Sequence, residues 1–347
     1  FDVTKSGAGT LRFSAANTYN GSTAISQGTL ALAPGGSIAG SSAITLGTGA
    51  IFNASPAGGF TLAAGRLLAG TGAVNGNVSV APGATIDPGN LDDGSAGTLT
   101  FSNNLTLGGN VTNGFVVANN VTVGGGVNDL LEVGGNLNLS GTNTLLLTPV
   151  SGSLTNGHYT LIRYGGTLTG GASNLVVAFA GFPPAGTVTV DDSVPGEIRL
   201  DVVSNPANLA WQGDGGANYW DVGVSGNWLA GVTPALFAPG DNVVFDDASP
   251  NRIVNLTVPV APGSLTVNGA GDYTFSGSGR ISGASGLVKN STGLLTLLTT
   301  NDFSGPTTIA AGTLQLGNGT ITGTLGPGHI TDNGTLAFNH PSALTVS

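Results

Sequence analysis

The chain has 347 residues, of which 40% are apolar and only 7% are charged, and it contains 60 Gly but no Cys and no Met. Its formal net charge of −10 argues against nucleic acid and anionic membranes as partners, because both require clustered Lys and Arg. The lack of Cys excludes disulfides, thiolate metal sites and a Cys nucleophile. The sequence also contains no run of 18 apolar residues, which is the length a helix needs to span a membrane.

The first stretch, from Phe1 to about Gly89, consists of short alternating apolar runs that end at Gly or Asn-Gly. Hairpins would need partners of matched length joined by two-residue turns. A coiling chain instead places each strand about 4.8 Å from the strand one turn earlier, which explains strands of three or four residues that recur about every ten. The pattern therefore predicts a parallel β-helix, with strands at 10–13, 23–25, 29–32, 43–46, 50–52 and 60–62.

The second stretch, roughly Gly70 to Val203, keeps this pattern, with strands predicted at 76–80, 97–101, 104–107, 130–133, 136–139, 143–147 and 159–162. Its Asn and Thr residues are expected to stack along the coil and to hydrogen-bond from turn to turn. Between Phe179 and Val203 the runs lengthen and Pro183-Pro184 intervenes. This predicts an antiparallel excursion or a break in the coil.

The composition changes near Asn205, because residues 205–250 contain all three Trp together with five Asp. Three indoles within eighteen residues can supply a compact core that short strands alone cannot, which predicts a small Trp-rich β insert. From Arg252 the earlier pattern resumes. The sequence thus predicts a β-helix over 1–204, an insert or spacer over 205–250, and a resumed β-helix over 251–347.

The two ends of the chain carry copies of one unit, aligned at a constant offset without gaps. Lys5 corresponds to Lys289, and Tyr19 stands where Phe303 does. The identical pairs continue with Gly9/Gly293, Leu11/Leu295, Asn17/Asn301, Gly21/Gly305, Thr23/Thr307, Ile25/Ile309, Gly28/Gly312, Thr29/Thr313, Leu30/Leu314 and Leu32/Leu316. Internal repetition of this length indicates a repeat architecture, in which Leu30 and Leu314 both point into the coil.

The repeated motif is Gly-Leu-x-Lys, Gly-x-Leu-x-Leu, Asn-x-Tyr/Phe-x-Gly, Thr-x-Ile and Gly-Thr-Leu, read from Gly286 to Leu316, and it recurs between Lys5 and Leu32. It resembles the autotransporter passenger-associated β-strand repeat. The run Gly240–Asp246 after the Trp block is similar to a spacer between such repeats in very large bacterial surface proteins. This resemblance implies an all-β, right-handed parallel β-helix (solenoid) that is exported and displayed as a stalk, fibre or adhesive surface.

An enzymatic alternative is a polysaccharide lyase or hydrolase, which needs carboxylates that converge on adjacent turns of the coil. His158, His329 and His340 are scattered, and no Gly-x-Ser-x-Gly motif is present. The acids of the first half are Asp2, Asp87, Asp92, Asp93, Asp129 and Glu132. We therefore predict a protein that is not an enzyme and that uses no cofactor.

Two further clusters have a functional interpretation beside a structural one. Asp241, Asp246 and Asp247 are a Ca²⁺ candidate, because hard oxygen ligands on a loop suit that ion, but Asp beside Gly240 is also typical of a structural turn. The indoles of Trp211, Trp220 and Trp228 either pack as a core or form a glycan-stacking platform.

The ends of the sequence fall within repeats, which suggests processing or a segment of a longer chain. An uncovered turn of a β-helix exposes unpaired backbone groups that another such turn can bind. We predict an extracellular filament or surface stalk that assembles head to tail with further copies of itself, or that continues into adjoining repeats of a longer chain. Its interface would contain Phe1, Val3, Leu344 and Val346. The alternatives are a glycan-binding adhesin and a β-helical polysaccharide-degrading enzyme.

Overall fold

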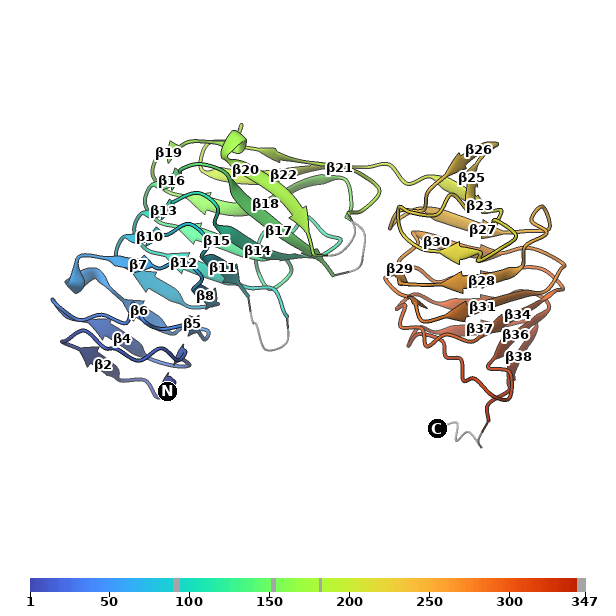
Figure 1. Ribbon diagram of the computed structural model, residues 1–347, viewed down its shortest axis with the longest axis horizontal. Helices are drawn as coiled ribbons and strands as arrows, with labels where there is room; N and C mark the ends of the chain where they lie inside the picture. The colour runs from blue at the N-terminus through green and yellow to red at the C-terminus, as the bar shows by residue number, and fades with distance from the viewer. Residues whose placement is uncertain (90–93, 151–153, 181–182, 342–347) are drawn as a thin grey trace. The chain divides into compact units, whose positions relative to one another are not determined.

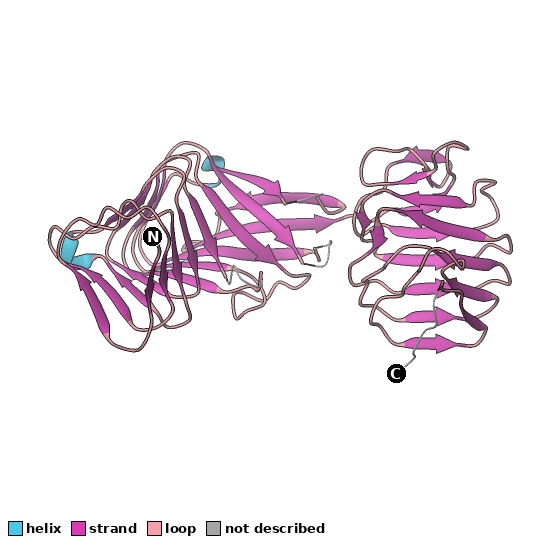
Figure 2. Cartoon of the chain, turned by 60° about the horizontal axis from the view of Figure 1, so that its bottom comes forward, coloured by secondary structure: helices cyan, strands magenta, loops and turns pink. Residues whose placement is uncertain are grey.

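The structure of the protein is a computed structural model that describes residues 1–89, 94–150, 154–180 and 183–341. These residues form many short strands, together with the 3₁₀ helices η1 (Ser55–Ala57) and η2 (Ala172–Asn174), as Figure 2 shows. No helix among them is long and apolar enough to cross a membrane. The predicted all-β composition is confirmed.

The chain divides into two compact units. The first contains residues 1–149, 155–181 and 188–203, and the second contains residues 150–154, 182–187 and 204–347. In each unit the strands stack as the turns of a coil (Figure 1), and we call one such turn a rung.

The first unit is built from three sheets that run along the coil. The first sheet contains β1 (Val3–Lys5), β3 (Thr23–Ile25), β5 (Ala43–Leu46), β8 (Leu67–Gly70), β11 (Thr85–Pro88), β14 (Thr112–Val117), β17 (Asn143–Pro149) and β20 (Leu175–Phe179). The second sheet contains β2 (Thr10–Phe13), β4 (Thr29–Leu32), β6 (Ile51–Asn53), β9 (Ala73–Asn75), β12 (Thr98–Phe101), β15 (Leu130–Val133), β18 (Gly157–Tyr164), β22 (Glu197–Ser204) and β21 (Gly186–Asp191). The third sheet contains β7 (Phe60–Leu62), β10 (Val78–Val80), β13 (Leu105–Leu107), β16 (Leu137–Leu139) and β19 (Leu168–Thr169).

The second unit repeats this plan. One sheet contains β26 (Thr233–Ala235), β25 (Trp228–Ala230), β23 (Asn208–Trp211), β27 (Asn242–Phe245), β30 (Ser264–Val267), β33 (Leu287–Lys289), β35 (Thr307–Ile309) and β37 (Ile330–Asp332). Another contains β24 (Tyr219–Trp220), β28 (Ile253–Leu256), β31 (Tyr273–Gly277), β34 (Leu294–Leu297), β36 (Thr313–Leu316) and β38 (Thr335–Phe338). A third, short sheet pairs β29 (Pro259–Val260) with β32 (Arg280–Ile281).

Parallel pairing between successive rungs confirms the predicted parallel β-helix. Val3 pairs with Thr23 in the first rungs, whereas Thr112 pairs with Thr144 further along, across a longer stretch of chain. The rungs therefore lengthen along the first unit. The third sheet begins only at β7. In the rungs before it, the described residues show one isolated parallel β-bridge in addition to the strands, between Ala16 and Ser37.

Alternate residues of each strand point into the coil, as period-2 alternation requires. Leu30 and Leu314, the equivalent residues of the two repeat copies, are both fully buried, which confirms their predicted orientation. Gly28, at the corner before β4, has a positive φ of 73°, and a Cβ there would lie less than 3.0 Å from the carbonyl oxygen of Gly9 on the preceding rung. Only Gly fits such a tightly stacked corner.

Antiparallel strands occur at one end of each unit. β18 pairs with β22 in antiparallel fashion, which confirms the excursion expected between residues 179 and 203. In the second unit, β25 pairs antiparallel with both β23 and β26, while β23 pairs parallel with β27. The Trp-rich stretch is thus continuous with the coil that follows it.

Candidate functional site

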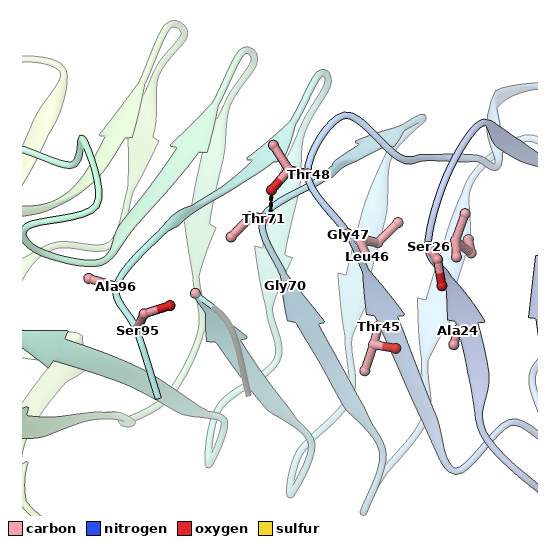
Figure 3. A pocket seen from close by; sticks show the side chains of 12 residues that line it. Ala24, Ser26, Thr45, Leu46, Gly47, Thr48, Gly70, Thr71, Ser95 and Ala96 are labelled. Atoms are coloured by element: carbon pink, nitrogen blue, oxygen red, sulfur yellow. Dashed lines mark hydrogen bonds between the residues drawn. The ribbon is translucent and has the colours of Figure 1, made fainter. Parts of the chain in front are cut away.

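A groove of about 620 Å³ lies along the first unit. It follows the corners after β3, β5 and β8, and Thr48 Oγ1 and Thr71 Oγ1 form a 2.9 Å hydrogen bond in its wall, as Figure 3 shows. Its other side contains Gly89 and Ala96. No charged side chain lines the groove among the described residues, so it presents hydroxyl groups, short apolar side chains and backbone.

A buried carboxylate, that of Asp129, lies beside Gly89, one of the residues that line the groove. The Gly97 N–H donates to Asp129 Oδ1 at 2.6 Å, and the Val116 N–H donates to Asp129 Oδ2 at 2.5 Å. Asp129 is fully buried, and a Cβ on Gly89 would lie 2.6 Å from its Oδ1. The carboxylate therefore connects β14 to the chain that enters β12.

Asp87 is the acidic neighbour of Asp129. Burial, together with a smaller effect of the charge of Asp87, raises the pKa of Asp129 to about 7, although the two backbone N–H groups oppose this shift. Burial also raises the pKa of Asp87. The structure thus brings together two acids that the sequence showed only as isolated residues. Both oxygens of Asp129 accept backbone N–H groups, which suits a structural clamp better than an attacking or proton-donating group.

The three aspartates of the Ca²⁺ candidate lie at two corners of the coil, Asp241 directly before β27 and Asp246 and Asp247 directly after it. Asp241 accepts N–H groups from Ala207 at 2.7 Å and Ala238 at 2.8 Å, and burial raises its pKa. Asp246 accepts the Ala248 N–H at 2.9 Å.

Asp247 accepts N–H groups from Ala270 and Gly271 on the next rung, which lower its pKa, and it pairs with Arg252 at 3.1 Å. Within the described ranges, no three His, Cys, Asp or Glu side chains gather as metal ligands. Each of the three aspartates instead caps a corner of the coil.

The indoles are core residues. Trp211, Trp220 and Trp228 are at most 1% exposed, and the Trp211 and Trp228 rings meet edge to face with centroids 5.0 Å apart. They pack onto Phe245 and Phe275 of the following rungs. A stacked sugar needs an exposed ring face, so the glycan platform suggested for these three residues is incompatible with their burial.

The predicted assembly residues are only partly described. Phe1 is 87% exposed, and its ring stacks on Tyr19 at 5.5 Å, while Val3 is half-buried at an outer edge of the coil. Leu344 and Val346 lie outside the described residues.

Of the three His, His158 lies 3.6 Å from Asp201, and both side chains are exposed.

Polar ladders connect the rungs. The side-chain oxygen of Asn77 accepts the Asn104 N–H at 3.3 Å, that of Asn104 accepts the Asn136 N–H at 2.8 Å, and that of Asn136 accepts the Thr167 N–H at 2.9 Å. In the second unit, Asn242 bonds to Asn208 at 3.0 Å and to Ser264 at 2.9 Å. The expected stacking of Asn side chains is confirmed.

Sequence reasoning assigned no role to the repeated lysine, which lies inside the coil. Lys5 is 7% exposed and Lys289 is fully buried. Lys5 Nζ donates to the carbonyl oxygens of Ser6, Gly7 and Gln27, and Lys289 Nζ donates to that of Ser291. The sequence feature that could have predicted this buried position is the recurrence of Lys, in both copies, among apolar residues that point into the coil.

The repeated unit matches a known family. Residues 3–32 and 287–316 match the passenger-associated-transport-repeat family model. These segments are β1–β4 and β33–β36, so the resemblance noted from the sequence is confirmed at both ends. No curated protein shows a significant match to the chain. The two matched segments are thus similar to the repeats of autotransporter passengers, and each of them lies within a parallel β-helix.

Proposed function

We propose, from the two passenger-associated transport repeats and the coil that contains them, that the protein is a non-enzymatic extracellular structural module. It serves as a stalk or fibre subunit at the cell surface, and its rungs stack head to tail on those of further copies. Its polar groups maintain the coil and do not act on a substrate.

The observation that carries this proposal is that polar side chains form hydrogen bonds from one rung to the next. The amide oxygens of Asn77, Asn104 and Asn136 bind backbone N–H groups of successive rungs. Asp129 and Asp241 likewise bind backbone N–H groups with both carboxylate oxygens. Groups held in this way contribute rigidity along the coil axis, which a fibre requires, and have little capacity left for proton transfer.

Electron microscopy of the purified chain tests the proposal. We expect unbranched filaments of uniform width that lengthen with protein concentration, because a head-to-tail contact does not close on itself. Monodisperse particles at all concentrations, or closed rings, would contradict the assembly part of the proposal.

The groove supports a second candidate function, binding or cleavage of a glycan. Its lining residue Gly89 lies against Asp129, and Asp87 is a charged neighbour of Asp129. A screen against acidic and neutral polysaccharides should release no product. Product release that Asp129→Asn or Asp87→Asn abolishes in a folded protein would replace the structural proposal with an enzymatic one.

A further inference from the structure

The chain contains several Asn-x-Ser/Thr triplets, the motif in which the amide of the Asn can accept a sugar. A coil rich in Asn and Thr produces such triplets by composition alone, so the motif by itself identifies no site. Sugar attachment needs an Asn side chain that is exposed and whose amide nitrogen is free. The hydrogen bonds of each Asn side chain therefore decide which triplets can be modified in the folded chain.

Triplets in or next to the strands use their Asn side chains to hold the coil together. The Oδ1 atoms of Asn77 and Asn104 each accept a backbone N–H of the next rung, and Asn104 is half-buried. Asn138 Nδ2 donates to Thr106 Oγ1 of the preceding rung at 3.3 Å. Thr106 is also the third residue of the Asn104 triplet, and it lies within β13. A sugar on these amides would disturb the bonds between rungs, so these triplets are structural.

Two triplets outside the strands differ. One begins at Asn120, after β14, and the other begins at Asn318, after β36, and the Asn and Thr of both are exposed. In each, the Thr hydroxyl donates to the Oδ1 of its own Asn at 2.8 Å, and the Thr N–H donates to the same oxygen. In the described part of the chain, no other such triplet has this hydroxyl bond, and no residue accepts a hydrogen bond from Nδ2 of Asn120 or Asn318. Both triplets thus hold the amide by its oxygen and leave its nitrogen free.

A buried side chain holds the first of these loops. Asn128 is 2% exposed, and its Nδ2 donates to the carbonyl oxygens of Asn120 and Thr122, both at 2.6 Å. Its Oδ1 accepts the Ala118 N–H at 2.7 Å. All three of these bonds go to the segment that carries the triplet. A buried amide that is satisfied in this way fixes the backbone of the loop, so the triplet is displayed in one geometry.

The second loop is held by its own backbone and by the next rung. Asn318 Oδ1 accepts a further N–H, from Ile321 at 2.8 Å, and the Gly319 N–H donates to the carbonyl oxygen of Asn339 at 2.7 Å. Gly319 has a positive φ of 86°, which favours Gly at the middle of this triplet. Different contacts therefore produce the same exposed arrangement in the first unit and in the second.

We propose that Asn120 and Asn318 are N-glycosylation sites, which accept a sugar once the coil has formed. This modification goes beyond the structural role proposed above. The donor is a sugar carried on a phosphate or diphosphate, and a transferase that binds the Asn-x-Thr triplet supplies it. The bond from the sugar C1 to the phosphate oxygen breaks, and its electron pair leaves with the phosphate. Nδ2 bonds to C1 and loses one proton to a base of the transferase.

The Thr hydroxyl contributes to this step through the amide oxygen. An amide nitrogen is a weak nucleophile because its lone pair is delocalised into the carbonyl. The two hydrogen bonds donated to Oδ1 draw electron density toward that oxygen, so a proton is lost more easily from Nδ2 as the bond to C1 forms. They also fix the amide plane and present Nδ2 in one orientation. Thr122 and Thr320 are therefore positioning residues for the modification.

Peptide mass spectrometry of the chain isolated from the cells that make it tests the proposal. We expect sugar on the peptides that contain Asn120 and Asn318, and none on Asn77 or Asn104, whose amides hold the rungs together. Similar amounts of sugar at all four residues would show that the folded geometry selects nothing and would overturn the proposal. An unmodified Asn120 or Asn318 would overturn the assignment of that site.

Substitutions of Thr122 in the same cells test the role of the hydroxyl, with Asn318 as the internal control. Thr122→Val has nearly the same shape but no hydroxyl, and it should reduce the sugar at Asn120 by at least about tenfold. Thr122→Ser keeps the hydroxyl and should retain most of the sugar. The sugar at Asn318 should be unchanged in both variants, and circular dichroism checks that both are folded. Full modification of Asn120 in Thr122→Val would refute the role of the hydroxyl.

These outcomes are independent of the proposed function. Filaments formed by a chain without sugar would remove the modification and leave the structural module in place. Sugar at both sites on a chain that never assembles would leave the modification in place and contradict the head-to-tail assembly.

Discussion

Asp129 is the residue whose ionisation the fold opposes most clearly. Its side chain is fully buried, and burial raises its pKa to about 7 from an ordinary value of 3.8, even though two backbone N–H groups favour the charged form. The folded chain therefore holds a proton at Asp129 over a pH range in which the unfolded chain has released it. Because a proton bound preferentially by the folded state stabilises it, stability is greatest below about pH 4 as far as this group is concerned.

The prediction is that the free energy of unfolding falls as pH rises from about 4 to about 7 and then levels off, with a loss of up to roughly 4 kcal/mol from this group. Urea titrations at closely spaced pH values measure it. Asp129→Asn has no titrating group at this position, so its profile should be flatter across the same window, even if the variant is less stable overall. A wild-type profile that keeps its slope in Asp129→Asn would show that other groups cause it.

At the scale of elements, the corners decide whether one rung can stack on the next. Gly28 and Gly49 have nearly the same backbone, with φ of 73° and 74°. A Cβ on Gly28 would come within 3.0 Å of carbonyl oxygens of the preceding rung, whereas a Cβ on Gly49 would meet no atom within 4 Å. The pair therefore separates the strain of a positive φ from the crowding between rungs.

Gly49→Ala should cost about 1 kcal/mol of unfolding free energy, the penalty for a left-handed alanine. Gly28→Ala should cost about 1–3 kcal/mol more, because the corner must move away from the rung before it. Chemical denaturation of both variants checks this difference. Equal costs would mean that the stacked corner is free to shift.

The fold was predictable from the sequence to the extent that it is local and repeated. The short strands, the Gly residues between them and the repeated unit at both ends were enough to predict the parallel coil. They also predicted that Leu30 and Leu314 point into the coil. Which residues share a column was not predictable, because rung length changes along the chain. Asn77 and Asn104 are 27 residues apart and Asn104 and Asn136 are 32, so no single period aligns them.

The candidate site was less predictable for the same reason. Asp87 and Asp129 look unrelated in the sequence, and they meet only because the intervening rungs have particular lengths. The burial of the three Trp residues depends on Phe245 and Phe275, the second of which belongs to a rung that sequence reasoning placed in another region. Pattern reasoning identifies the strands and their faces, but convergence of side chains depends on how the coil is wound.

At the scale of the whole molecule, each of the two units has its own buried core, and all three Trp residues belong to the second. Coils of this kind gain most of their stability from contacts between neighbouring rungs, so a defect acts mainly within the unit that contains it. Tryptophan emission therefore reports the unfolding of the second unit, whereas far-UV circular dichroism reports the strands of both.

We predict that the two signals do not coincide during urea unfolding. Gly28→Ala, in the first unit, should move the dichroism transition to lower urea and leave the Trp midpoint unchanged. Gly312→Ala has the equivalent corner in the second unit, with φ of 72°, and a Cβ that would approach the Gly293 carbonyl to less than 3.0 Å, so it should lower the Trp midpoint. One coincident transition that both substitutions shift by the same amount would show instead that the units unfold as a single cooperative structure, since two-state behaviour requires probes to agree.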